Sequence, residues 1–288
     1  MNKLISGKRA QILRCLCEGN SMRATARLVD CSFNAVSRLL ISAGRACTKF
    51  QDKALRNLPC HRLQIDEVWG FVGAKDLNCS REKKADGWGS AWVWTALCAD
   101  TKLLATWFIG PRVPQSAYHL LYDLRERLAP DHNVQITTDG FAMYLKPVHS
   151  AFVGQADYAQ LQKIYGAEPT SSGRYSPAQC MGTRRTVISG NPDPKHISTS
   201  YVERHHMNLR MSNRRFTRLT NAFSKKLENL EHSVALYAMH YNFCRIHRTL
   251  RVTPAMEAGV ADHVWDVEEI VALLVSGNAG SNKPRREV

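Results

Sequence analysis

The chain has 288 residues, of which 39 are Lys or Arg and 25 are Asp or Glu, so its formal net charge is +14. Hydrophobic residues make up 44% of the sequence, which supports a packed core and excludes disorder over most of the length. The longest nearly continuous apolar run, residues 91–99, is much shorter than the about 20 residues that cross a bilayer. The start of the chain lacks a signal-peptide pattern, so we expect a cytoplasmic, bacterial, nucleoid-associated protein with no membrane partner.

The positive charge is unevenly distributed. Residues 1–61 contain 11 basic and 3 acidic residues, whereas residues 62–200 contain 15 basic and 13 acidic residues. A second basic block follows at residues 201–256, with 10 Lys and Arg. Two basic blocks around a nearly neutral middle favour a polyanionic partner, and nucleic acid is the commonest one.

Nine cysteines are scattered along the chain, and no two of them have the two-residue spacing of a zinc knuckle. In a reducing compartment such cysteines are expected to be small core residues. A metal site built from distant Cys and His residues stays open, because spacing alone does not test it.

The first part of the chain has the pattern of three short helices. Apolar spacing predicts helices over residues 8–17, 22–28 and 33–43, the last ended by Gly44. A four-residue turn, residues 29–32, separates the second helix from the third. This pattern matches a helix-turn-helix, in which the third helix enters the major groove of DNA.

The outer faces of the second and third predicted helices carry side chains that suit DNA. Asn and Arg can bind base edges, and arginines can hold phosphates. The candidate DNA-binding residues here are Arg23, Arg27, Asn34, Ser37 and Arg38. The opposite, apolar face of the third helix is expected to contain Phe33, Val36, Leu39 and Leu40.

The middle of the chain alternates between strand and helix patterns. Five strands are predicted, over residues 62–71, 90–98, 103–109, 133–138 and 151–158. A loop over residues 74–89 joins the first two strands. Helices are predicted over residues 115–128, before the fourth strand, and 141–148, before the fifth. The predicted order is β-β-β-α-β-α-β, followed by helices.

Two aspartates occupy positions of chemical interest in this order. Asp66 lies inside the first predicted strand, and Asp139 directly follows the fourth. The first and fourth strands can be neighbours, and close carboxylates stay ionised only with a cation between them. A hard dication such as Mg²⁺ fits oxygen ligands. For either aspartate alone, a turn or capping role stays open.

Three segments together resemble the carboxylate motifs of DDE transposases. They are LQIDEVW at Leu63–Trp69, TDG at Thr138–Gly140 and VERHH at Val202–His206. The segments are most similar to those of the bacterial insertion-sequence-one family. The resemblance implies an RNase H-like α/β fold, with a mixed five-stranded sheet and flanking helices, preceded by the all-α helix-turn-helix. It also implies a catalytic, metal-binding triad of Asp66, Asp139 and Glu203 with two Mg²⁺ ions, for which Mn²⁺ can substitute.

On this resemblance we expect four regions. Residues 1–48 are the helix-turn-helix domain and residues 49–61 a linker. Residues 62–256 are the catalytic domain, with an insertion loop at residues 163–199 that is rich in Gly, Pro and Ser. Residues 257–288 are a C-terminal helix and tail.

The second basic block adds candidate DNA contacts. Arg210, Arg214 and Arg215 follow Glu203 on or after the same predicted helix. Residues 241–254 resemble the Y-N-x-x-R-x-H-x-x-L…T-P segment of several integrase-like transposases, in which Arg245 and His247 occupy the basic positions. The end of this segment also fits the start of a helix, with Thr253 as its N-cap, and the two interpretations are compatible.

Several residues next to the motifs are expected to have no catalytic role. Glu67 is expected to be a supporting or exposed residue, and Asp100 a turn residue. His205 and His206 are expected to be surface residues or phosphate contacts. Some relatives carry a cysteine-pair zinc ribbon before the helix-turn-helix, but this chain lacks those pairs, so we do not transfer that site.

The implied function is a DNA transposase, a polynucleotidyl transferase that binds terminal inverted repeats, cleaves a strand and joins the freed 3′ end to target DNA. Its partners would be double-stranded DNA, at element ends and target, and further copies of itself in a homodimer or larger oligomer. Three alternatives stay open. They are an RNase H-fold nuclease or resolvase, a helix-turn-helix transcription regulator without catalysis, and a degenerate copy that binds without cutting.

Overall fold

The computed structural model describes residues 4–130, 133–166 and 180–276. The chain divides into two compact units, each of which we describe by itself. The helical unit comprises Met1–Arg56, Trp69–Trp92 and His205–Val288, and the sheet unit comprises Asn57–Val68 and Val93–Arg204. No helix among the described residues is long and apolar enough to cross a membrane.

The helical unit begins with three helices, α1 (Ser6–Cys17), α2 (Met22–Leu28) and α3 (Phe33–Ala54). Serine side chains cap the second and third helices, since Ser21 accepts the N–H of Ala24 at 3.0 Å and Ser32 accepts that of Ala35 at 3.1 Å. The predicted four-residue turn between α2 and α3 is also confirmed. Phe33, however, is 47% exposed and does not belong to the buried face of α3.

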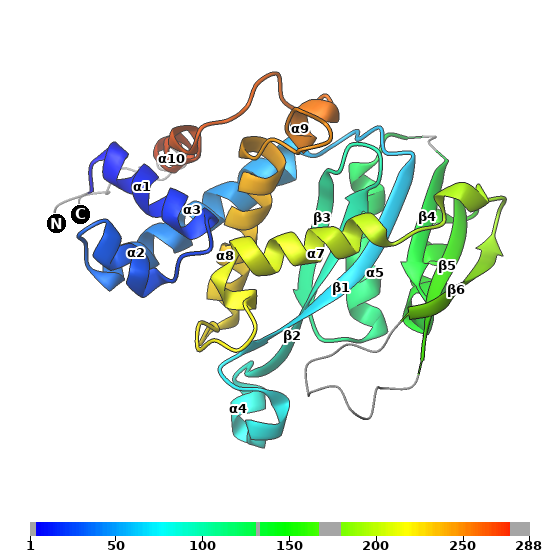
Figure 1. The fold of residues 1–288 in the computed structure, drawn as a ribbon, viewed down its shortest axis with the longest axis horizontal. Coiled ribbons are helices and arrows are strands. Elements are labelled where there is room, and N and C mark those ends of the chain that lie inside the picture. The colour runs from blue at the N-terminus through cyan, green and yellow to red at the C-terminus, as the bar shows by residue number, and fades with distance from the viewer. Residues whose placement is uncertain (1–3, 131–132, 167–179, 277–288) are drawn as a thin grey trace, which may run out of the picture. The chain divides into compact units, whose positions relative to one another are not determined.

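The helix α3 does not end at Gly44, as predicted, but continues to Ala54. The reason is tertiary, because α3 packs along α8 (Leu227–Met239), as Figure 1 shows. A Cβ added at Gly44 would lie 2.4 Å from the Cβ of His232 on α8. The glycine therefore permits a close helix–helix approach instead of capping a helix, and the predicted boundary at residue 48 falls inside α3.

The helical unit also contains helices within and after the second basic block. Within it, α10 (Val267–Ser276) packs against α1 and α3, and a π-helical turn (His240–Cys244) continues α8. Thr253 accepts the N–H of Met256 at 3.2 Å at the start of α9 (Pro254–Glu257), as the sequence predicts. Residues 74–89, predicted as a loop, contain a 3₁₀ turn (Asp76–Asn78) and the short helix α4 (Arg81–Ala85).

The sheet has six described strands, in the order β3-β2-β1-β4-β5-β6. Their bounds are β1 (Arg62–Val72), β2 (Gly89–Cys98), β3 (Leu104–Gly110), β4 (Val134–Asp139), β5 (Ala156–Tyr165) and β6 (Cys180–Ser189). The sheet is mixed, because β4 pairs in parallel with β1 and β5, whereas β5 and β6 are antiparallel. The strands β2 and β3 extend the sheet on the other side of β1.

The prediction of five strands is wrong, because β6 lies inside the segment predicted as an insertion loop. Antiparallel pairing with β5 supplies the backbone hydrogen bonds that make this polar, mostly exposed segment a strand. Residues 167–179 of the predicted loop lie outside the described residues. The fifth strand is also shifted from residues 151–158 to Ala156–Tyr165, because Val153 and Gly154 adopt left-handed conformations that end the preceding helix.

Two helices of the sheet unit contact the strands. The helix α5 (Pro114–Arg127) packs against β3 and α6 (Leu145–Phe152), and α6 packs against β5. The helix predicted over residues 115–128 is confirmed, and its apolar face is buried, as Leu120, Leu121 and Leu124 show. A 3₁₀ turn (Ala142–Tyr144) links β4 to α6, and the first turn of α7 (Ser200–Ser212) closes the unit.

Candidate active site

The two predicted aspartates lie at the ends of paired segments of neighbouring strands. The strands β1 and β4 pair in parallel, with Ile65 opposite Thr138. Asp66 and Asp139 are the next residues on the two strands, and opposed residues of paired strands project to the same face. Both aspartates are half-buried. The predicted neighbour relationship between the first and fourth strands is therefore confirmed.

Electrostatics link Asp139 to both other carboxylates. Burial raises the pKa of Asp139 above its usual value, and the negative charges of Asp66 and Glu203 act in the same direction. The backbone N–H of Phe141, which donates to Asp139 Oδ1 at 3.0 Å, and the charge of Arg112 oppose the rise in pKa. The charges of Asp66 and Glu203 thus both act on Asp139 within the sheet unit.

Glu203 lies in the first turn of α7, as predicted for a helical carboxylate. Its Oε1 accepts a hydrogen bond from Thr199 Oγ1 at 2.6 Å, and its Oε2 forms an ion pair with Lys163 of β5. Gln64 on β1 accepts the N–H groups of Tyr201 and Val202, at 2.8 and 3.1 Å. The side chain of Gln64 therefore joins the strand of Asp66 to the start of the helix of Glu203.

Glu67 is buried, so the expectation of an exposed residue is wrong and that of a supporting residue agrees with its contacts. Its side chain is 1% exposed and lies 2.7 Å from Arg112 Nε through Oε1. Tyr144 donates its hydroxyl to Oε2 at 2.6 Å. Burial, together with the charges of Asp66 and Asp139, raises the pKa of Glu67, while Tyr144 and Arg112 lower it.

Sequence analysis missed Arg112, Tyr144 and Lys163. Arg112 stacks over the ring of Phe141, with its guanidinium carbon 4.0 Å from the ring centroid. These residues contact the carboxylates from distant parts of the chain, and no spacing rule connects them. One signal existed, namely a carboxylate at Glu67 in an otherwise buried strand, since a buried charge requires a partner.

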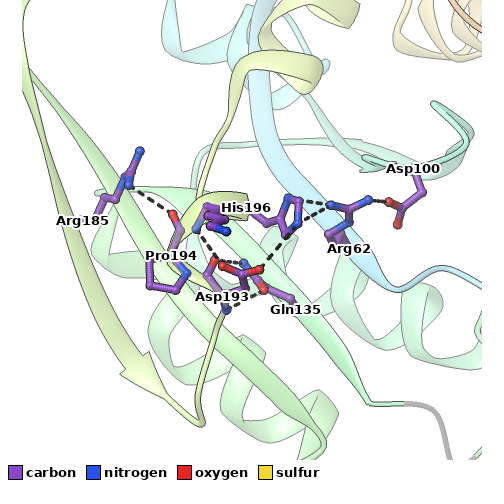
Figure 2. A network of polar contacts seen from close by, with 8 residues as sticks. Arg62, Asp100, Gln135, Arg185, Asp193, Pro194 and His196 are labelled. Atoms are coloured by element: carbon purple, nitrogen blue, oxygen red, sulfur yellow. Dashed lines mark hydrogen bonds and ion pairs between the residues drawn. The ribbon is translucent and has the colours of Figure 1, made fainter.

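A second polar network holds the segment before α7, and Figure 2 shows its members. Gln135 of β4 accepts the N–H of Asp193 at 3.0 Å and donates to its carbonyl at 3.2 Å. The Nη1 atom of Arg62, on β1, lies 2.8 Å from Nε2 of His196. The same guanidinium forms an ion pair with Asp100. Arg185 of β6 donates to the carbonyl of Pro194 at 3.1 Å. The network anchors the chain that leads into the first turn of α7.

The donor atoms of the three carboxylates suit a magnesium ion, but their placement meets the needs of a metal site only in part. Asp66, Asp139 and Glu203 supply oxygen donors, which hard cations prefer. Within residues 4–130, 133–166 and 180–276, no three His, Cys, Asp or Glu side chains lie together as a ready metal site. Asp66 and Asp139 lie on adjacent strands, and Glu203 is paired with Lys163.

The candidate DNA-binding residues of α2 and α3 mostly face solvent. Arg23, Arg27, Asn34 and Arg38 are exposed, and Ser37 is half-buried. These side chains therefore form part of the outer surface of α2 and α3.

The second basic block is less uniform. Arg245 is exposed and donates to Ser212 Oγ at 3.2 Å, while Arg210, Arg214 and His247 are half-buried. Arg215 has a different position, because its guanidinium donates to Ser224 Oγ at 2.7 Å and Ser233 Oγ at 3.2 Å. Burial lowers the pKa of Arg215 to about 10. These contacts make Arg215 a structural residue of the helical unit.

The expectation that His205 and His206 lie on the surface is wrong. His205 is 1% exposed and His206 is 8% exposed. The ring of His205 packs edge-on against Tyr241, with centroids 4.6 Å apart, and burial lowers the pKa of His205 well below its usual value. The side of α7 that carries these histidines is thus buried.

Most cysteines are buried or half-buried, as expected for core residues, whereas Cys180 is exposed. All nine are free thiols. Cys60 and Cys98 form a thiol–thiol hydrogen bond, which lowers the pKa of Cys98 to about 6 and raises that of Cys60.

No protein-family model matches the chain, and no curated protein does. Solved structures with partial likeness include the Mos1 Strand Transfer Complex, at 10% identity and a TM-score of 0.24, over 55% of this chain and 59% of that one. A Mos1 transposase paired-end complex with left transposon end has the same identity, TM-score and coverage of this chain, over 60% of its own.

A pre-cleavage Mos1 transpososome has 9% identity and a TM-score of 0.33, over 99% of this chain and 82% of that one. The likeness to the first two structures thus spans about three fifths of the Mos1 chain.

Proposed function

We propose that this chain is a DDE-type DNA transposase of the kind found in the insertion-sequence-one family, with an RNase H-like catalytic part. The observation that carries the proposal is the register of β1 and β4, which sets Asp66 and Asp139 on adjacent strands. The influence of Glu203 on the pKa of Asp139 adds the third carboxylate. Paired carboxylates of this kind serve phosphoryl transfer in many unrelated enzymes.

In this proposal Asp66, Asp139 and Glu203 hold the divalent ions, two Mg²⁺ or their Mn²⁺ substitutes. When bound, such ions stabilise the charge on the reacting phosphate and lower the pKa of bound water. Asp139 is kept in place by the N–H of Phe141. Gln64 and Thr199 hold the start of α7, so that Glu203 stays near the aspartates once Lys163 is released.

The helical unit would supply DNA binding. Exposed side chains of α2 and α3, including Arg27, Asn34 and Arg38, would bind the inverted repeats at the element ends. Arg210, Arg214, Arg245 and His247 are candidates for phosphate contacts. Because two element ends must be joined to one target, we propose that the active form is at least a dimer.

The test uses DNA that carries the inverted repeats found on either side of the coding sequence. Purified protein and Mg²⁺ should release 3′ ends at the repeat and join them to a target plasmid. The matched control is Asp66→Asn, which removes one charge at nearly constant size and should abolish both steps. Cleavage without joining would favour a nuclease or resolvase, and equal activity of Asp66→Asn would overturn the proposed site.

A further inference from the structure

Arg112 lies at the entrance to α5, next to the carboxylates, and its side chain is held from two sides. Its Nε lies 2.7 Å from Oε1 of Glu67, and its guanidinium stacks on Phe141 at 4.0 Å. Phe141 is the residue whose N–H binds Asp139. The position of Arg112 is therefore coupled to both aspartate-bearing strands.

The exposure of the two partners differs greatly. The side chain of Glu67 is 1% exposed, whereas that of Arg112 is 38% exposed. Glu67 is further fixed by Tyr144, which is fully buried and whose pKa is raised by burial and by the charge of Glu67, so its hydroxyl stays protonated and donates. A buried, doubly bound carboxylate thus anchors an arginine that reaches solvent.

Charge adds a reason for this arrangement. Asp66, Asp139, Glu67 and Glu203 place four carboxylates in this part of the sheet unit, and a phosphodiester would add a further negative charge. Guanidinium groups bind phosphate oxygens through a planar fork, and a pre-oriented one loses little freedom on binding. Arg112 is oriented in this way by Glu67 and Phe141 before any ligand arrives.

We infer that Arg112 binds the phosphate of the DNA strand at the Asp66–Asp139 site, and that Glu67 is the positioning residue that orients Arg112. This inference rests on the proposed function, because the phosphate is that of the DNA to be cut. It adds a phosphate-binding arginine and its buried anchor to the three carboxylates.

The experiment separates phosphate binding from a structural role by a double-substitution cycle. The probe is a duplex with the inverted repeat, and a second duplex carries a neutral methylphosphonate at the junction of repeat and flank. Affinity is measured in Ca²⁺, an oxygen-binding dication. Loss of the phosphate charge should weaken binding to the unsubstituted protein by about tenfold to a hundredfold. The Arg112→Gln protein should bind both duplexes more weakly, and the difference in affinity between them should be much smaller.

Control variants keep the result interpretable. Arg125→Gln removes a cation of α5 that hydrogen-bonds Gln155, and should leave the methylphosphonate effect intact. Glu67→Gln should reduce the methylphosphonate effect as Arg112→Gln does, whereas Tyr144→Phe, which removes one of the two contacts of Glu67 and keeps the ion pair, should reduce it less. The inference would be overturned if the losses of DNA affinity from Arg112→Gln and from the methylphosphonate were additive. It would also be overturned if Arg112→Gln lowered the melting temperature of the protein and left the methylphosphonate effect unchanged.

The phosphate-binding role of Arg112 and the proposed catalysis can fail separately in these experiments. If the unsubstituted protein fails to cleave any duplex in Mg²⁺ while the cycle shows coupling, the transposase proposal fails and the phosphate site stands. If the protein cleaves and the cycle is additive, only the role of Arg112 is rejected.

Discussion

The Oε1 atom of Gln64 accepts the backbone N–H of Tyr201 at 2.8 Å, and that of Val202 at 3.1 Å. The first N–H groups of a helix have no partner within the helix, and here a side chain from a strand supplies one. Gln64 lies two residues before Asp66, and Tyr201 two residues before Glu203. One carboxamide therefore fixes the spacing between the strand and the helix of the candidate triad.

Replacing Gln64 with Ala should destabilise the protein by about 1–3 kcal/mol, because two N–H groups lose their buried acceptor. The same change should reduce DNA cleavage more than DNA binding, since Glu203 loses its fixed position. Chemical denaturation and single-turnover cleavage measure the two effects. Gln162→Ala, an exposed position on β5, is the control and should change stability by less than about 0.5 kcal/mol. Equal effects of both variants would contradict the role of Gln64.

Replacing Lys163 with Gln should make Mg²⁺ bind more readily, because Glu203 no longer has a competing cation. The ion pair is about one third exposed on both sides, so the gain is small, up to about fivefold in the half-saturating concentration. Thermal unfolding followed during a Mg²⁺ titration gives this concentration. A higher requirement for Mg²⁺ in the Lys163→Gln protein would show that Lys163 assists the site instead.

Replacing Asp139 with Asn should stabilise the metal-free protein at neutral pH. The pKa of Asp139 is raised on folding, so the folded chain holds its proton to a higher pH than the unfolded chain does. Stability therefore falls as the pH rises from the ordinary value of 3.8 through the raised pKa, and an amide avoids this loss while keeping the acceptor for Phe141.

The check is chemical denaturation with a chelator, at neutral pH and at pH 3.8, the ordinary pKa of Asp139. The advantage of the Asn variant should shrink at the acidic pH, where the wild-type carboxyl is also partly neutral. Added Mg²⁺ should then stabilise the wild type more than the variant. An advantage that grows at acidic pH would have the wrong sign.

Replacing Gly44 with Ala should destabilise the helical unit by about 1–3 kcal/mol, because the new Cβ would meet that of His232 at 2.4 Å. This loss outweighs the gain of about 1 kcal/mol that Ala brings to a helix interior. Gly7→Ala, in α1, has no heavy atom within 4 Å of the new Cβ and should be neutral or stabilising. Thermal melts should therefore show a lower melting temperature for Gly44→Ala and an equal or higher one for Gly7→Ala, each compared with the unsubstituted protein.

Replacing Arg38 with Ala should weaken binding to repeat DNA by about 1–3 kcal/mol if this exposed side chain contacts a base. The control is Arg45→Ala on the same helix, where the exposed guanidinium pairs with Glu228. Fluorescence anisotropy with repeat and scrambled duplexes distinguishes base reading from general attraction. Equal losses on both duplexes would mean that Arg38 contacts only phosphate.

Much of the secondary structure could be predicted because its signals are local. The caps at Ser21, Ser32 and Thr253 act over three residues, and the buried face of α5 repeats along one helix. The three carboxylates also lie where the motifs imply, on β1, β4 and α7. Errors occurred where a distant segment decided the outcome, as for β6, which needs β5 as its pairing partner.

The candidate site shows the same division between local and distant effects. The sequence by itself determined which carboxylates to examine, which segments would be helices or strands, and where the basic charge gathers. Only the tertiary structure decided that Lys163 pairs with Glu203, that Glu67 anchors Arg112, and that His205 is buried among tyrosines. Side-chain contacts between residues far apart depend on how strands and helices pack, and neither spacing nor composition encodes that packing in a form that can be read along the chain.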